Sequence, residues 1–490
     1  MGEIRSPYFS LGQNHFGDNS DHIHSPYISY GGEDYHGDYA AIHPPYSSAG
    51  DYRGDNAEIH SPYSSAGDYL ADNTEIHSEA LFHQDISGNS YSDVRIYRVG
   101  KALRKSKKAM YIPQQISIGP IHHGKKNLRL MERKKSEYNK IFWEKRVSKA
   151  GELHGATKDK FWNALKKDEK NISQCYEDGS PIENPEGFLG LILRDAVFIF
   201  ELFLKYSENE EFKKDSILKE PGLRAAIRRD LILLENQLPF FILENLYNCL
   251  PDNIKGGNTE FKTLACFYFQ RHFPSKFSSA ATTPILHFTD LVRSLLSFAR
   301  GNGKPVEQIK SFHSATRLRQ AGVKFKVPRE RDCLLDVDFR RLRKEFHIPQ
   351  LQIHGDTESL FRNLMALEKS VYPGQEYICH YINLLSILVV KPKDAKLLMK
   401  NKIVTYNKDE VAARDLIYSL ASSSTTDLHS CYHDIFSAVD DYYKSSWAKN
   451  PAYFIEEFFG NFWKGVGTVS AASLLILTLV QTICSIRGLR

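Results

Sequence analysis

Apolar residues recur along the chain from Val94 with the three-to-four-residue spacing of amphipathic α-helices. The pattern predicts helices over residues 128–145, 187–206, 221–250, 259–269, 289–300, 357–369, 378–390 and 409–444. One stretch differs. It contains three short segments with alternating apolar and polar positions or β-branched residues, at 323–327, 333–339 and 348–353. We therefore expect a mainly α fold with a small antiparallel β meander (α+β), in a domain that spans residues 94–450.

Residues 466–486 are 21 consecutive uncharged residues. A helix of that length spans roughly 31 Å, the thickness of a bilayer core. Aromatic residues before it, including Phe458 and Trp463, stand where an interfacial belt would lie, in a segment at 451–465. We predict a single transmembrane helix over 466–486, with a buried core helix as the alternative; its markers are Val466, Leu474, Leu477, Val480 and Ile486.

Orientation in the membrane stays open. The position of the span favours a tail anchor with a cytosolic domain, whereas Arg487 and Arg490 favour the reverse orientation. The sequon at Asn171 could be glycosylated only in the second case. We expect a single-pass protein of the plasma membrane or an internal membrane.

Residues 1–90 contain a repeat with an Ile-His-Ser-Pro-Tyr core, and successive copies begin at Ile4, Ile23, Ile42, Ile59 and a decayed Ile76. The units hold Pro, Gly, Asp and Tyr with few aliphatic residues, so they lack the apolar surface that stacked repeats bury. We predict a disordered arm over 1–90. Its serines before proline are candidate phosphorylation sites.

Charge is distributed unevenly along the chain. The chain has 490 residues, 42% hydrophobic and 25% charged, which excludes collagen, a disulfide miniprotein and a polytopic membrane protein. Residues 1–90 hold 2 basic and 14 acidic residues, while residues 95–170 hold 22 basic and 7 acidic residues. Such an acidic arm before a basic segment indicates either an arm that competes for a basic surface or a solubilising tail beside solvated helix faces.

Metal and phosphate sites are weakly indicated. The seven cysteines are scattered without a C-x-x-C pair, which predicts neither a disulfide framework nor a zinc site. The turn from Gly119 to Lys126 fits G-x-x-x-x-G-K, but Lys126 replaces the hydroxyl residue and Pro120 removes a backbone donor. His122 and His123 are adjacent and point apart. We expect no catalytic residue, metal or cofactor here.

Four carboxylates lie in very apolar helical segments, where a charge needs a partner: Asp195, Glu201, Asp230 and Glu235. Nearby candidate partners are Arg194, Arg228 and Arg229, and Asn236 and Gln237 can donate further hydrogen bonds. We predict a structural polar network. Paired carboxylates could also perform acid–base catalysis, so an enzyme with an unrecognised carboxylate site is the alternative.

A basic stretch precedes the first long helix and supplies seven cations: Arg95, Arg98, Lys101, Arg104, Lys105, Lys107 and Lys108. Such a stretch attracts anionic lipid headgroups at about 1 kcal/mol per cation. It lacks the stacking aromatics or known module that nucleic-acid binding uses, so we expect lipid rather than nucleic acid.

Several long motifs follow one another in an order that resembles the plant-specific family called domain of unknown function 247. The matching segments lie at residues 111–124 (YIPQQISIGPIHHG), 131–135, 194–201, 230–240 (DLILLENQLPF), 314–325, 357–364 and 474–481. The resemblance covers about residues 94–490 and leaves the repeat arm outside.

The resemblance implies a single-pass plant membrane protein without an established enzymatic activity, and for some members a role in self-recognition between pollen and stigma. It supplies no catalytic residues. We expect a membrane-anchored recognition or scaffold module with an unknown protein partner and, at the basic stretch, contact with anionic lipid.

Overall fold

The computed structural model describes residues 96–148, 154–178, 182, 184–255, 259–269, 284–297, 306–329, 333–423, 429–449 and 470–485 without 472 and 484. The arm and its repeats therefore lie outside the described residues, as do Arg95 and the interfacial segment 451–465. Met1–Gln84 and Asp85–Arg490 form separate units, and the fold below belongs to the second.

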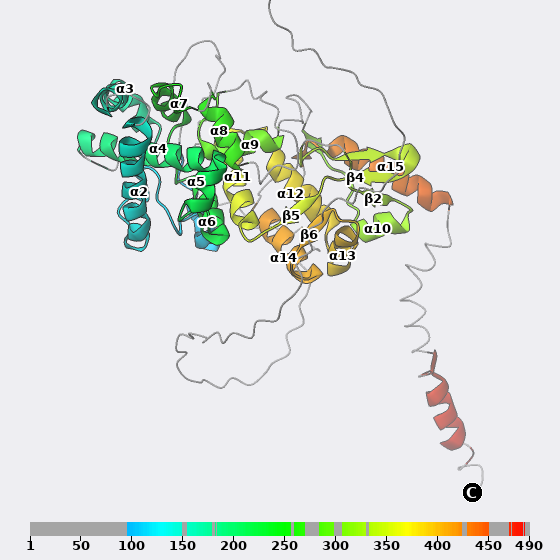
Figure 1. Ribbon diagram of the computed structural model, residues 1–490. Helices are drawn as coiled ribbons and strands as arrows, with labels where there is room; N and C mark the ends of the chain where they lie inside the picture. Colours follow the sequence, from blue (N-terminus) through cyan, green and yellow to red (C-terminus); the bar gives the residue numbers. More distant parts are fainter. Residues whose placement is uncertain are drawn as a thin grey trace, which may run out of the picture. The chain divides into compact units, whose positions relative to one another are not determined.

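That unit is mainly helical (Figure 1), as the sequence predicts. Its α-helices are α1 (Lys101–Ser106), α2 (Arg129–Ile141), α3 (His154–Gln174), α4 (Pro185–Ser207), α5 (Asn209–Lys214), α6 (Pro221–Ile232), α7 (Phe240–Asn248), α8 (Phe261–Phe269), α9 (Phe288–Ser297), α10 (Ala315–Gln320), α11 (Thr357–Val371), α12 (Tyr377–Leu388), α13 (Pro392–Lys400), α14 (Glu410–Ala421) and α15 (His433–Lys449). A π-helical turn at Phe142–Val147 continues α2, and short 3-10 turns occur at Lys108–Met110, Lys126–Leu128 and Arg341–Arg343.

Helix α4 is the centre of the first helix group and packs against α2, α3, α7 and α8. It is apolar on almost every side, which is typical of a helix surrounded by others. Phe203 of α4 stacks on Tyr268 of α8 with ring centroids 4.3 Å apart, and Phe288 of α9 lies 5.6 Å from Phe203. Aromatic packing of this kind adds to the stabilisation that burial gives.

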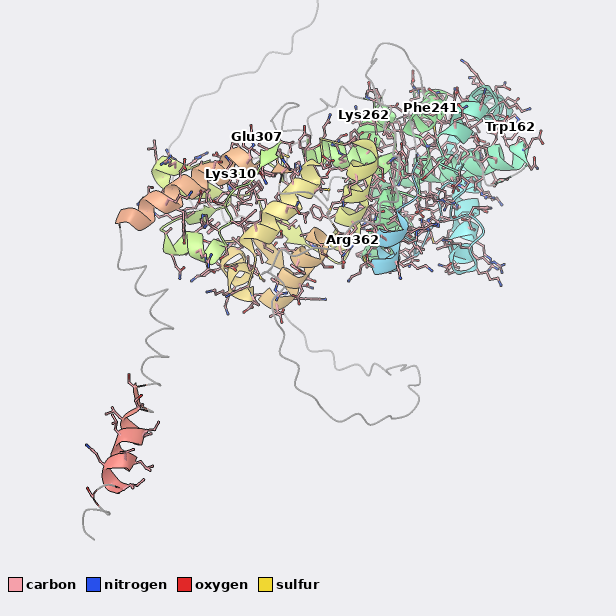
Figure 2. All side chains as sticks on the ribbon, turned by 180° about the vertical axis from the view of Figure 1, so that it is seen from behind. Trp162, Phe241, Lys262, Glu307, Lys310 and Arg362 are labelled. Atoms are coloured by element: carbon pink, nitrogen blue, oxygen red, sulfur yellow. The ribbon has the colours of Figure 1, made fainter. Side chains whose placement is uncertain are left out.

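A second group contains α10, α12, α13 and α14, with α9 and α11 connecting it to α6 of the first. Arg362 of α11, labelled in Figure 2, contacts α14 in this group. Its Nη2 donates to the Ser419 carbonyl at 3.0 Å and to the Ser419 hydroxyl at 2.8 Å, and its Nε donates to Glu358 at 2.9 Å. The arginine is buried, so these bonds fix the two helices against each other.

The predicted antiparallel meander is wrong in its pairing. Strand β4 (Glu345–His347) pairs in parallel with β2 (Lys324–Lys326) and antiparallel with β3 (Asp338–Arg340). Strand β5 (Leu351–Ile353) leaves this sheet and pairs in parallel with β6 (Val404–Tyr406). A meander pairs neighbours in sequence, whereas β6 arrives from beyond α13, so local alternation could not reveal it.

Two predicted helices each prove to be interrupted. The helix expected over 221–250 ends at Ile232 and resumes at Phe240, because Gln237 donates its side-chain amide to the carbonyls of Leu231 and Leu233. Pro239 then caps the second helix. The helix expected over 409–444 is α14 and α15, with the short strand β7 (His429–Ser430) between them, paired with β1 (Glu307–Gln308).

The histidine before α9 predicts sensitivity to acid. His287 is fully buried, and its Nδ1 accepts the Asp290 N–H at 3.3 Å, while burial lowers the pKa of His287 to about 3. Below about pH 6.5 the histidine binds a proton in the unfolded state but stays neutral in the folded state. Its contribution to the free energy of unfolding is therefore fully present above about pH 6.5 and is lost as the pH falls towards 3. We expect a loss of about 1.4 kcal/mol per pH unit from this group.

Urea unfolding at pH 7 and pH 5 tests this expectation, with the variant His287→Asn, which keeps an acceptor without a titrating ring. The free energy of unfolding of the variant should depend less steeply on pH than that of the wild type. Equal slopes in the two proteins would contradict the assignment.

Candidate functional site

Residues 111–119 belong to no helix or strand, so their backbone N–H groups need other acceptors. Asp230, at the end of α6, supplies one of them. Its Oδ2 accepts from the N–H groups of Gln114, Gln115 and Ile116 at 2.9, 2.6 and 3.0 Å. Its Oδ1 accepts from Arg229 at 2.6 Å. One buried carboxylate therefore holds three consecutive backbone donors.

Asp195 of α4 holds the next part of the segment. Its Oδ2 accepts the Gly119 N–H at 2.8 Å, and its Oδ1 accepts from Lys135 Nζ of α2 at 2.6 Å. Lys135 also donates to the Ser117 carbonyl at 2.8 Å. Neither charged side chain is exposed. Burial raises the pKa of Asp195, and the Lys135 ammonium and the Gly119 N–H oppose that rise.

The amides of the loop between α6 and α7 complete the backbone pairing. Asn236 accepts the Ile118 N–H at 2.8 Å and donates to the Ile116 carbonyl at 3.0 Å, as a neighbouring strand would do. Gln237 accepts the Phe288 N–H at 2.9 Å and so connects the loop to α9. The predicted donors thus bond mainly to the main chain rather than to carboxylates.

Helix α11, much later in the sequence, contributes the last hydrogen bonds of this network. Ser359 and Asn363 both donate to the Met110 carbonyl, at 2.7 and 2.9 Å, and Asn363 accepts the Leu234 N–H at 3.0 Å. Motifs at 111–124, 131–135, 194–201, 230–240 and 357–364 thus meet at one place, which we call the signature cradle.

The other two predicted carboxylates, Glu201 and Glu235, also belong to the motifs of the cradle. Glu201 is 1% exposed and accepts from Arg146 Nε at 2.7 Å. Glu235 accepts the Val99 N–H at 2.7 Å and pairs with Arg104. Burial would raise the pKa of Glu235, but the nearby His122 ring, the hydrogen bond from the Val99 N–H and the charge of Arg104 lower it below its usual value.

The candidate partners named from sequence are correct in one case out of three. Arg229 pairs with its neighbour Asp230, whereas Arg194 lies 3.9 Å from Glu132 and Arg228 donates to the Tyr268 carbonyl at 3.2 Å. The other carboxylates accept hydrogen bonds from cations 55 to 131 positions away in sequence, and Glu201 also lies 3.8 Å from Lys205 of its own helix. All four carboxylates are buried and hydrogen-bonded, which favours a structural role over acid–base catalysis.

Gly119 is the tightest point of the cradle. Its φ is +73°, and a Cβ there would overlap the Gln237 carbonyl oxygen. We expect Gly119→Ala to lower the free energy of unfolding by about 3 kcal/mol, from left-handed backbone strain together with overpacking. Gly124 has a φ of +77° and open space around its Cβ position, so Gly124→Ala should cost about 1 kcal/mol. Equal losses in chemical unfolding would refute the steric argument.

The turn after Gly119 departs from a phosphate loop. The Gly119 N–H that such a loop would offer to phosphate is bound to Asp195. His122 is buried and His123 is exposed, so the pair does not converge. Across the described ranges, no group of three His, Cys, Asp or Glu side chains is placed to hold a metal ion.

The basic stretch separates into paired and unpaired cations. Arg98 pairs with Asp178 at 2.7 Å, Arg104 pairs with Glu235 and Lys107 lies 3.5 Å from Glu358. The exposed lysines that form no ion pair with any described residue are Lys101, Lys105 and Lys108. We call these three the lysine patch.

The predicted glycosylation site lies within the described residues, whereas the predicted membrane span lies only partly within them. Asn171 lies half-buried within α3 and donates to Asp168 at 3.3 Å. Of the predicted span, 466–469, 472, 484 and 486 lie outside the described residues, and Leu474 and Leu477 are exposed in a helical segment. No helix within the described part of the chain reaches the length and apolarity needed to span a membrane.

A surface groove was not predicted from sequence. It encloses about 400 Å³ between α12, α14 and the β1–β7 pair. Among the described residues its lining contains no Lys, Arg, Asp or Glu, and its residues are Ile309, Phe312, Asn383, Ser386, Ile387, Val389, Val390, Tyr418, Ala421, Ser422, His429 and Ser430. Val411 and Tyr418 are both exposed and lie seven residues apart on α14. This spacing was the sequence pattern that could have indicated a second apolar face on the helix.

Comparison with known proteins places the chain among plant sequences. It is 26% identical over 428 residues to a UPF0481 protein of Arabidopsis thaliana, covering 80% of this chain and 86% of the relative. A putative UPF0481 protein of the same plant is 21% identical over 495 residues, covering 79% and 89%. No solved structure matches the chain. The profile of DUF247, described as a plant protein of unknown function, matches residues 96–477, and the chain therefore belongs to that family.

Proposed function

We propose that this protein is a membrane-anchored recognition or scaffold module that acts by binding another protein rather than by catalysis. The groove between α12 and α14 carries the proposal. Phe312, Val390 and Tyr418 are 42%, 56% and 65% exposed there, and large apolar side chains gathered around a hollow are typical of binding surfaces.

The groove has the chemistry of a peptide-binding site. The described residues of its lining include no Lys, Arg, Asp or Glu, which favours an occupant without charge at the contact, since a buried unpaired charge is costly. Asn383, Ser386 and His429 are polar residues of its lining. The proposed occupant is an uncharged segment of a partner protein that inserts aliphatic or aromatic side chains.

Charge placed in the groove tests this function. Full-length wild type, Val390→Glu and Tyr418→Glu are compared for quantitative association with proteins of a plant membrane extract. Leu130→Glu on α2 is the matched control, because Leu130 is 71% exposed and outside the groove. We expect at least one extract protein to bind the wild type and the Leu130→Glu control equally. Its binding to both groove variants should be at least about tenfold weaker. Equal association by all four proteins would refute the groove as the binding site.

The anchor belongs to the same proposal. The uncharged run over 466–486 supports a single membrane span, and Lys464 and Arg487 flank it. Protease protection with one tag before Met1 and one after Arg490, together with a glycosidase shift at Asn171, determines the orientation. A protected N-terminal tag supports cytosolic partners, and a sugar on Asn171 supports partners at the cell surface.

Anionic lipid contact is assigned to the lysine patch. Reversing its three charges in Lys101→Glu, Lys105→Glu and Lys108→Glu should weaken binding to phosphatidylserine vesicles by at least about 100-fold, since each lost cation removes about 1 kcal/mol and each new carboxylate is repelled by the lipid. Sedimentation at low and physiological salt measures the change. The control for net charge is a triple variant in which Lys393, Lys400 and Lys402 are each changed to Glu. An equal loss of vesicle binding in that variant would show that the patch has no special role.

The enzyme alternative retains one clear test. A soluble, folded Asp195→Asn/Asp230→Asn variant that loses a measurable turnover would support catalysis by carboxylates. Unfolding of the same variant would support the structural network.

A further inference from the structure

A turn of four cations around one leucine joins β3 to β4. It runs from Arg340 to Lys344 with the sequence Arg-Arg-Leu-Arg-Lys, and we call it the basic turn. The Leu342 side chain at its centre is 100% exposed, more than any other large apolar side chain in the described ranges. One exposed leucine is ordinary by itself, but a fully exposed leucine between four cations has the composition of a surface that enters lipid headgroups.

The cations of the basic turn are available to an external anion. Two of them are paired at the surface, Arg340 with Asp338 at 3.4 Å and Arg341 with Asp441 of α15 at 3.9 Å. The two cations that form no ion pair with any residue the structure describes are Arg343 and Lys344. Exposed pairs are weak, so an anionic surface can compete for all four cations.

Lys344 places a cation where the backbone favours glycine. Its φ is +57°, in the left-handed region that an L side chain rarely adopts. Its N–H donates to the Arg341 carbonyl at 3.2 Å, and its carbonyl accepts the Lys324 N–H at 2.7 Å, so β2 and the turn fix this conformation. Glycine would adopt it at lower cost but would remove the charge. A lysine kept against this preference indicates a partner for its side chain outside the fold.

Helix α15 connects the basic turn to the predicted membrane span. It packs against β3 and the turn (Figure 1), with the ring centroids of Tyr442 and Phe339 5.8 Å apart. The helix ends at Lys449 and the uncharged run begins at Val466, so residues 450–465 connect them. A chain of that length reaches at most about 55 Å. A short tether therefore keeps this end of the domain near any bilayer that the run enters, which raises the local concentration of lipid at the turn.

We propose that the basic turn is a membrane-docking site, in which Leu342 enters the headgroup region of an anionic bilayer and the four cations contact lipid phosphates. The proposal rests on the anchor of the proposed function, which brings the bilayer close, and it is separate from the lysine patch, which precedes α2. The leucine favours lipid over nucleic acid or an acidic protein segment, whose anionic groups would leave it in water. Anionic lipids are concentrated in the cytoplasmic leaflet, so this site places the folded domain in the cytosol.

Lysine labelling on vesicles tests the proposal. Full-length protein is incubated with vesicles of phosphatidylcholine, with or without phosphatidylserine, and acetylated with a water-soluble ester. Mass spectrometry measures the rate at each lysine. We expect the rate at Lys344 to be about fivefold lower on the anionic vesicles than on the neutral ones. Lys393 of α13, which is exposed and outside the turn, should change by less than about twofold, since surface charge is screened over short distances.

The variant Leu342→Ser separates insertion from simple charge attraction. It keeps all four cations, and the side chain that it replaces makes no contribution to the core because it is fully exposed. The protection of Lys344 should fall to less than about twofold in this variant, because a leucine that enters the bilayer contributes at least about tenfold to the affinity. Leu130→Ser on α2, where Leu130 is also exposed, is the matched control and should keep the full protection.

Three outcomes would overturn the proposal. They are equal labelling of Lys344 on neutral and anionic vesicles, full protection in Leu342→Ser, and a sugar on Asn171 in cells, which would place the domain on the opposite side of the membrane. Flotation with neutral vesicles at high salt measures the anchor alone, since it removes charge attraction. A failed anchor and a failed basic turn are therefore distinguishable, and the labelling of Lys344 decides the second whether or not the anchor inserts.

Discussion

Lys135→Met is expected to lower the free energy of unfolding by about 3–5 kcal/mol, because it leaves the Asp195 carboxylate buried without its cation. Lys135 and Asp195 are both fully buried, with 2.6 Å between Nζ and Oδ1. Methionine fills a similar volume, so the loss reports the missing charge and hydrogen bonds rather than a cavity. Chemical unfolding of the variant measures it.

The double variant Lys135→Met/Asp195→Asn makes this prediction specific. Removing both charges should recover a large part of the lost stability, since no unpaired buried charge remains. Lys134→Met is the matched control one residue away, because Lys134 forms an exposed pair with Glu137 worth less than about 1 kcal/mol. A double variant as unstable as Lys135→Met alone would show that the charge pairing is not the cause.

Asp230→Asn should lower the free energy of unfolding by about 3 kcal/mol. The amide has one acceptor oxygen and cannot serve three backbone donors and Arg229 together, so at least one of these donors loses its partner. Hydrogen exchange should also accelerate at the amides of Gln114, Gln115 and Ile116, which a general loss of stability would not single out.

Asp178→Asn serves as the control for this second prediction. Its carboxylate is 58% exposed and pairs with Arg98 at the surface, so its loss should cost less than about 1 kcal/mol. Unchanged exchange at residues 114–116 in Asp230→Asn would mean that other groups hold the segment.

Helical periodicity predicts α4 and α11 closely, because each has one dominant apolar pattern and an uninterrupted chain. Periodicity missed α3, although Phe161, Leu165 and Ile172 are buried at helical spacing. It also ran through Leu233, where a side chain rather than a proline ends the helix. Local signals do not reveal hydrogen bonds that a later residue makes to an earlier carbonyl.

The sequence allowed us to predict which carboxylates are buried in the cradle, but not which residues they pair with. Burial of Asp195, Glu201, Asp230 and Glu235 follows from their apolar neighbours, since a carboxylate there needs partners. The cations that hydrogen-bond Asp195, Glu201 and Glu235 come from other elements, and the nearest arginine in sequence is correct only for Asp230. The groove was not predictable, because its walls come together from α12, α14 and residues near β1.

The bond from Asn363 to Met110 joins residues 253 positions apart. A ribosome adds roughly 5–20 residues per second, so the segment before α2 waits about 13–50 s after its synthesis before this partner exists. Closing so long a loop also slows folding after release. The Met110 carbonyl therefore lacks this partner until α11 has been synthesised, whereas the N–H groups of residues 114–116, 118 and 119 can pair once Asp195, Asp230 and Asn236 have appeared. The beginning of the domain is thus synthesised first and completed last.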